Sequence, residues 1–271
     1  MKTKLLPGLC LIILLIFNPL PAFTQQQTID LTADELVRMA ISNIETNDKL
    51  KRAYLSFERT ETEYDLDRSG RCKRVNNANL CISVLNRRTT YHGNAYPETI
   101  RGGSRESEFS INLNKILLSS YTYSFIDLKD PANATIADDF GFECNNCLVI
   151  RFVPKAILPD ITEITSPNMS LKDIGIHETA MRMNGVIYID KTHLFLRKHI
   201  GKLDESFSKY GAAVQVTIGS IDIEQTLQSD LDNLIIIKSA QIIYQIRKAW
   251  GFLGYETRKL VWEYDEYRLN P

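Results

Sequence analysis

Leu260-Val-Trp-Glu-Tyr-Asp-Glu-Tyr267 is the stretch that decides the fold of this chain most clearly. Successive side chains of an extended strand point to opposite faces, so Leu260, Trp262 and Tyr264 share one face and acidic residues occupy the other. Such alternation is typical of an antiparallel sheet that packs on one side only. The stretch therefore predicts a mainly β fold.

Other segments show the same period-two pattern and extend this prediction. We expect a long strand from about residue 53 to the turn Asp67-Arg-Ser-Gly70. Further strands are expected at Leu80–Arg87, Gly185–Asp190, Leu194–Ile200, Val214–Ile223, Leu234–Arg247 and Tyr255–Tyr267.

Helical signals interrupt the strands. Thr32-Ala-Asp-Glu35 forms a capping box, and Leu36, Ala40 and Ile44 continue it as an apolar stripe that ends near Asn47. Phe109–Ser120 and Leu171–Met183 are two further candidate helices. Because neither a composition break nor a repeat divides the chain, we expect one domain of mostly antiparallel strands with two or three helices.

Composition excludes several classes of protein. The chain has 271 residues, of which 44% are hydrophobic and 24% charged, which is neither a disordered composition nor that of a membrane bundle. The 32 basic and 33 acidic side chains nearly cancel, so no nucleic-acid partner is expected.

The first 24 residues have the layout of a secretory signal peptide. Lys2 and Lys4 precede an apolar run from Leu5 to Phe17, which is shorter than the about 20 residues that cross a bilayer. Cleavage is expected after Ala22 or Thr24, and the second would leave a mature domain of residues 25–271. The mature protein would be periplasmic or secreted, with no integral membrane segment. An uncleaved anchor is the alternative.

Four cysteines remain after such cleavage, and an oxidising compartment favours disulfides over metal thiolates. Cys72 and Cys81 would face each other across a hairpin whose turn is Asn76-Asn77. Cys144 and Cys147 flank a second Asn-Asn turn. The pairings 72–81 and 144–147 are therefore predicted, with a redox-active C-x-x-C or a zinc site as the alternatives.

Motifs for catalysis are missing from the sequence. It contains no phosphate-binding loop, zinc-protease motif, nucleophile elbow or dinucleotide-binding glycine pattern, so we predict no catalytic residue, cofactor or metal. The histidines at positions 92, 177, 193 and 199 do not cluster, and we expect them to be solvated or hydrogen-bonded.

Aromatic residues concentrate on the predicted strands. Ordinary packing explains such a pattern, and the functional alternative is an apolar cavity between a curved sheet and the helices. The candidate lining residues are Leu55, Phe57, Tyr123, Phe125, Tyr188, Trp250 and Trp262.

The order of elements resembles a known family. An export signal, a capped helix and a strand ending at Asp67–Gly70 are followed by further short motifs: Tyr121-Thr-Tyr-Ser-Phe125, Phe152-Val-Pro154, Gly185-Val-Ile-Tyr-Ile-Asp190-Lys191, a strand with Arg197, and Trp262-Glu-Tyr-Asp-Glu-Tyr267. This pattern resembles the LolA/LolB-like superfamily of exported bacterial proteins, which includes the outer-membrane lipoprotein-sorting carriers.

The resemblance implies a fold and a function. The fold would be an incomplete, strongly curved antiparallel barrel with helices across its open side. The protein would be a non-catalytic carrier that binds a lipid or lipoprotein acyl chain. An envelope protein-interaction or sensor module of the same fold, and a secreted hydrolase with a site built from loops, are the alternatives.

Overall fold

The structure is a computed structural model, and it describes ten ranges of the chain. They are residues 31–53, 55–72, 82–92, 100–102, 109–111, 113–164, 171–209, 214–231, 233–248 and 254–269. The described residues from Thr32 onward belong to one compact unit.

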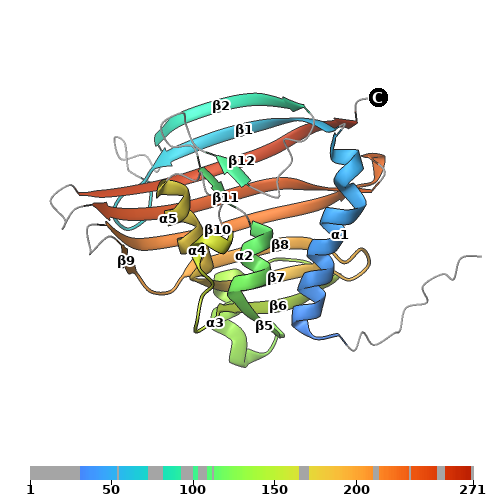
Figure 1. Cartoon of the computed structure of the whole chain (residues 1–271), viewed down its shortest axis with the longest axis horizontal. Coiled ribbons are helices and arrows are strands. Elements are labelled where there is room, and N and C mark those ends of the chain that lie inside the picture. Colours follow the sequence, from blue (N-terminus) through green and yellow to red (C-terminus); the bar gives the residue numbers. More distant parts are fainter. Residues whose placement is uncertain are drawn as a thin grey trace, which may run out of the picture. The chain divides into compact units, whose positions relative to one another are not determined.

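One large antiparallel sheet dominates this unit (Figure 1). Among the described residues its strand order is β2-β1-β12-β11-β10-β8-β7-β6-β5, with β9 paired to β10, and β3 and β4 form a separate two-stranded sheet. The strands are β1 (Leu55–Asp65), β2 (Ile82–His92), β3 (Ile100–Gly102), β4 (Phe109–Ile111), β5 (Tyr121–Phe125), β6 (Cys147–Pro154), β7 (Met183–Asp190), β8 (Leu196–Leu203), β9 (Phe207–Lys209), β10 (Val214–Gln228), β11 (Leu234–Lys248) and β12 (Tyr255–Leu269).

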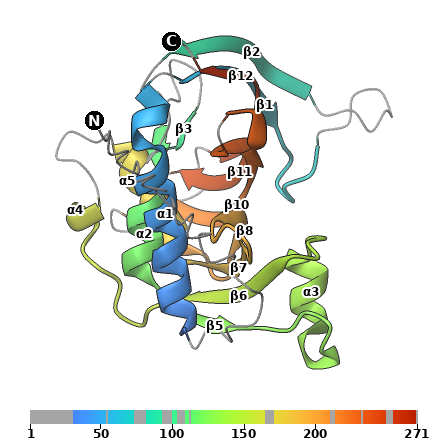
Figure 2. The same ribbon diagram turned by 90° about the vertical axis from the view of Figure 1, so that its right-hand side faces the viewer.

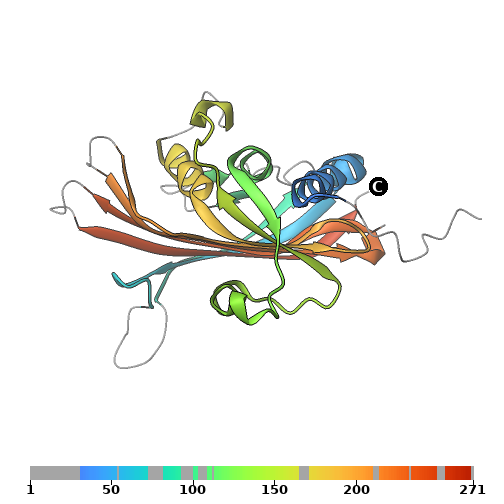
Figure 3. The ribbon, with the colours of Figure 1, turned by 90° about the horizontal axis from the view of Figure 1, so that it is seen from below.

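Helices lie on both faces of the sheet. Three of them, α1, α2 and α5, cover one face, and α3 lies on the opposite face (Figures 2 and 3). The helices are α1 (Ala33–Ala53), α2 (Leu113–Ser120), α3 (Ala134–Phe140), α4 (Ile161–Ile164) and α5 (Leu171–Met181), with single 3-10 turns at Pro131–Asn133 and Ser229–Leu231.

The predicted fold class is confirmed. The sheet is open, since β2 and β5 stand at its two ends, and all the pairs between its described strands are antiparallel. Apart from β9, consecutive strands from β5 to β12 run as neighbours, and β1 then pairs with β12. This topology gives the sheet one face toward the three helices and one face toward α3 or solvent.

Helix α1 begins where the capping box predicts. The backbone amide and hydroxyl of Thr32 both donate to the Glu35 carboxylate, and the amide of Glu35 donates to the Thr32 hydroxyl. The helix ends at Ala53, however, and not near Asn47. The stretch from Thr46 to Ala53 contains no Gly or Pro and is rich in residues that favour helices, so nothing in it stops the helix.

The second predicted helix is also corrected. Phe109–Ile111 is strand β4, and α2 begins only at Leu113. The apolar residues of Phe109–Ser120 fit a helical period, but the first three pair with Ile100–Gly102 in a ladder. A pairing partner that lies outside the segment decided the local structure here.

Candidate functional site

The cross-strand register assigns each strand residue to one face, because directly paired residues point to the same side. Gly219 of β10 identifies the face covered by helices, since a Cβ built on it would lie 2.6 Å from Thr179 Cγ2 of α5. We call this the inner face. The side that packs against α3 is the outer face.

Helix α5 sits directly on the inner face at Gly219. A Gly219→Ala change would force the Cβ into the Thr179 methyl group, and overpacking of this kind costs about 1–3 kcal/mol. We expect the change to lower the free energy of unfolding by that amount in urea titrations. Adding Thr179→Ser, which removes the methyl group and keeps the hydroxyl, should recover part of the loss. If the double variant were no more stable than G219A, the close approach of α5 would be contradicted.

The inner face is apolar and aromatic over β5 to β8. The Tyr121 ring lies 4.7 Å from that of Phe152, and its hydroxyl donates to the Ala180 carbonyl of α5. Ile150 and Ile187 are cross-strand partners and are fully buried. This part of the sheet is an apolar surface that the helices cover.

His199 lies in the middle of this apolar surface. Its cross-strand partners are Ile187 on β7 and Ile223 on β10, and its ring lies 5.0 Å from that of Phe152. The side chain is buried, and neither ring nitrogen has a hydrogen-bond partner in the part of the chain that the structure describes. Burial removes the imidazole from water, which penalises its charged form and lowers its pKa to about 3. We expected this histidine to be solvated or hydrogen-bonded. The structure shows it shielded from solvent and without a hydrogen-bond partner among the described residues, so the expectation is wrong to that extent.

The inner face becomes charged at β1. Arg59, Glu61 and Glu63 continue the alternation of Phe57, and each is at most 7% exposed. A Glu61 carboxylate oxygen lies 2.9 Å from Arg87 Nη2 of β2 and 3.7 Å from Arg59 Nη2. Glu63 pairs in the same way with Arg258 of β12, at 3.5 Å. These pairs bring opposite charges together, so the group as a whole carries little net charge.

Aromatic rings continue on the inner face beside these charges. Trp262 of β12 is fully buried between its cross-strand partners Glu61 and Ala240. The Phe57 ring lies 5.8 Å from that of Tyr264 and 5.3 Å from that of Tyr267. The inner face thus runs from an aromatic and charged end at β1 to an apolar end at β5.

The predicted lining residues are divided by the structure. Phe57 and Trp262 are buried on the inner face, and Leu55 is buried just after α1. Tyr123 is an inner-face partner of Phe152, whereas Phe125, at the end of β5, is 51% exposed. Trp250 lies outside the described residues.

Tyr188 is the lining candidate that the structure places elsewhere. It is buried on the outer face with Phe140 and Cys147. Its hydroxyl donates to the Phe140 carbonyl and accepts from the amide of Phe142, which ties α3 to strand β7. Alternation along a strand separates its two faces but does not say which one the helices will cover, so the sequence could not exclude this residue.

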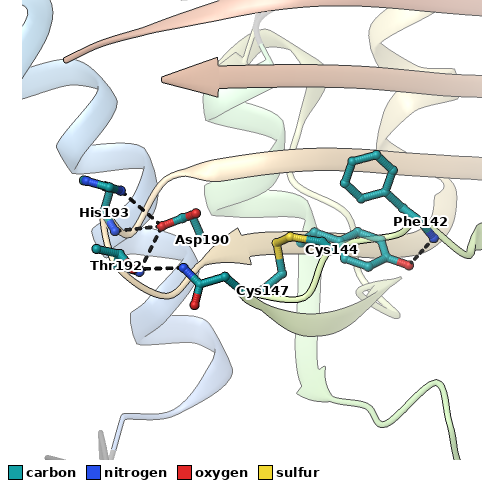
Figure 4. Close-up of a disulfide and its surroundings, with 8 residues drawn as sticks. Phe142, Cys144, Cys147, Asp190, Thr192 and His193 are labelled. Carbon is teal, nitrogen blue, oxygen red and sulfur yellow. Dashed lines mark hydrogen bonds and ion pairs between the residues drawn. A yellow bond between two sulfur atoms is a disulfide. The ribbon is translucent and has the colours of Figure 1, made fainter. Parts of the chain in front are cut away.

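The Cys144–Cys147 disulfide lies on the same outer face, with a Cα–Cα distance of 5.6 Å (Figure 4). It connects the loop after α3 to the start of β6 across an Asn-Asn turn, as predicted. A redox C-x-x-C is usually activated by a helix N-terminus, whereas Cys147 opens a strand. The 72–81 pairing stays a prediction, since Cys81 lies outside the described residues.

The outer disulfide closes a very short loop, so its effect on stability should be small. We expect C144A/C147A to lose at most about 2 kcal/mol of unfolding free energy, as the loop-entropy relation gives for so short a loop. Urea unfolding of the two proteins under oxidising conditions measures the difference. A loss of about 4 kcal/mol or more would mean that the bridge does more than restrict the unfolded chain.

Asp190 organises the turn beside this disulfide. Its carboxylate accepts from the amides of Thr192 and His193 and lies 3.4 Å from His193 Nδ1. The Asn43 side chain of α1 donates to the carbonyl of Leu194 at the end of this turn. His193 is thus a turn residue, and Asp190 has a structural role.

The described residues also bear on two other kinds of site. They contain no group of three or more His, Cys, Asp or Glu side chains that could hold a metal ion. No helix in the described ranges is both long enough and apolar enough to span a membrane.

Comparisons with known proteins add no relative. The chain matches no family model, no curated protein and no solved structure.

Sequence reasoning missed the polar residues of the inner face. The sequence did indicate the position of Glu61 and Glu63, because alternation along one strand puts them on the same face as Leu55 and Phe57. His199 carried no such signal. The sequence around a lone histidine in an apolar strand does not indicate whether its ring nitrogens are hydrogen-bonded.

Proposed function

We propose that this protein is an exported, non-catalytic binding protein that holds an acyl chain between the inner face of its sheet and helices α1, α2 and α5. The observation that carries the proposal is the apolar and aromatic inner face of an open sheet. The three helices that cover this face come from three separate parts of the chain.

The contacts of α1 support this proposal. The helix buries Leu36, Val37, Ala40 and Ile41 in contacts that are apolar and non-directional. An acyl chain offers the same kind of contact, so it could replace part of this apolar helix surface. The hydrogen bond from the Asn43 side chain to the Leu194 carbonyl is a directed contact of the same helix and would be lost if the helix moved away at that turn. The sheet ladders do not depend on α1 and would remain intact.

The disulfide supports export. Structural disulfides form and persist in oxidising compartments, and the Cys144–Cys147 bridge is of this kind. It agrees with the predicted signal peptide at residues 1–24. The proposal therefore includes export of the mature protein to the bacterial periplasm or out of the cell.

Trp262 allows a direct test, because the chain has only two tryptophans and Trp250→Phe leaves Trp262 as the sole emitter. A fatty acid brominated along its chain should quench Trp262 fluorescence saturably, and the matched unbrominated acid should bind without quenching. Native mass spectrometry of the exported protein should also show co-purified lipid.

Two outcomes would decide against the proposal. Absence of both lipid and quenching would count against any acyl chain on the inner face. A stable protein partner recovered by cross-linking, without lipid, would instead favour an envelope interaction module.

A further inference from the structure

His199 is a buried polar group whose ring makes no hydrogen bond to any described residue. Its flanking partners Ile187 and Ile223 are buried aliphatic residues, and its ring neighbour is Phe152. Both ring nitrogens are shielded from solvent. Most buried polar groups in folded proteins are hydrogen-bonded, so a group of this kind calls for a partner that the described part of the chain does not supply.

The chemistry of the ring limits what that partner can be. A neutral imidazole carries one N–H donor and one nitrogen acceptor. Leaving such groups buried and unsatisfied costs about 1–3 kcal/mol. A ligand oxygen that hydrogen-bonds to either nitrogen would recover part of this cost, and a purely hydrocarbon ligand would recover none of it.

The surroundings favour an uncharged partner. The cross-strand and ring neighbours of His199 in the described ranges include no charged side chain, so none of them would offset the cost of burying an ionised head group. A hydroxyl group avoids that cost. It can donate to the bare nitrogen or accept from the N–H, so it fits either tautomer.

We propose that His199 is the polar anchor of the binding site and selects apolar chains that carry an uncharged hydroxyl group. This inference rests on the proposed function, since it requires the chain to lie on the inner face. The hydroxyl would be held over β8, and the chain would extend across Ile221, Ile242 and Leu260 of β10, β11 and β12 toward Trp262. The anchor gives the ligand a defined position, which apolar contacts alone do not supply.

The test compares three probes of equal chain length: dodecanol, dodecyl methyl ether and dodecane. The affinity of each probe is measured by its displacement of a fluorescent fatty acid from the protein. We expect wild-type protein to bind dodecanol about tenfold more tightly than dodecane, with the ether between them because it accepts but does not donate. In His199→Phe this preference should be lost, and dodecane should bind at least as tightly as dodecanol because the hydroxyl would be buried without a partner.

A matched histidine serves as the control. His193 lies in the turn before β8 and is half exposed, so H193F should keep the tenfold preference. Nitrogen-15 NMR of the imidazole rings gives a second readout, in which dodecanol should shift the His199 resonances and dodecane should not. Thermal unfolding shows that each variant is folded.

The outcomes separate the two proposals. If wild-type protein binds no probe and no fluorescent fatty acid, both the proposed function and the anchor are overturned. If all three chains bind equally, or if the preference survives in H199F, the anchor alone is overturned. Ring resonances that do not respond to dodecanol would also overturn the anchor, because His199 would then have another partner, such as a trapped water.

Discussion

The protein should lose stability steeply as the pH falls from 7.5 to 4.5, and His199→Phe should remove a large part of that loss. Burial lowers the pKa of His199 to about 3, against 6.5 for the free side chain. Between these values the unfolded chain binds a proton that the folded chain does not, so the folded state loses stability as the pH decreases. The loss begins below pH 6.5 and levels off near pH 3.

The size of this effect follows from proton linkage. The slope approaches about 1.4 kcal/mol per pH unit, which amounts to about 2.7 kcal/mol between pH 7.5 and 4.5. Urea unfolding at several pH values measures it for wild type and H199F, and the difference between the two curves isolates this histidine from the carboxylates. H193F is again the control and should follow the wild-type curve. Parallel curves for wild type and H199F would show that the imidazole is not buried in its neutral form.

Glu61→Gln should be the second large perturbation. Glu61 is 1% exposed and neutralises Arg59 and Arg87 on the inner face. The substitution keeps the shape of the side chain but removes the negative charge that faces these two guanidinium groups. Breaking a buried pair in this way costs about 3–5 kcal/mol, and solvent at the partly exposed Arg87 reduces the expected loss to about 2–3 kcal/mol.

Strand β1 provides the matched control for this prediction. Glu58 pairs with Arg88 on the outer face of the same two strands, where both side chains are partly exposed. Glu58→Gln should therefore change the unfolding free energy by less than about 1 kcal/mol. Equal effects of the two substitutions would mean that the inner-face charges are as well solvated as the outer ones.

Local signals in the sequence predicted which helices and strands form better than they predicted where each one begins and ends. The capping box at Thr32 and Glu35 placed the start of α1 because the whole motif lies within four residues. The start of α2 was predicted too early. Residues 109–111 form a strand because they pair with residues 100–102, and the helix begins only after them. The turn across Cys144 and Cys147 was predicted, since a disulfide at this spacing needs one.

The site was less predictable than the fold. Period-two alternation groups Phe57 with Glu61, and Tyr188 with its own outer-face neighbours, but it does not say which group the helices cover. That choice depends on where α1, α2 and α5 pack, which the strand pattern does not contain. The surroundings of the His199 ring could be known only after its neighbours on three strands had been placed.

The pairing of β1 with β12 has a consequence for how the chain reaches this state. Residues 55–65 pair with the nearby strand β2 on one side, but their partners on the other side are residues 258–269, about two hundred positions later. Contacts so distant in sequence must overcome a large loop-closure entropy, which slows folding. The sheet cannot be completed until residues 255–269 have left the ribosome, so strand β1 has to wait for its second neighbour until synthesis of the chain is nearly finished.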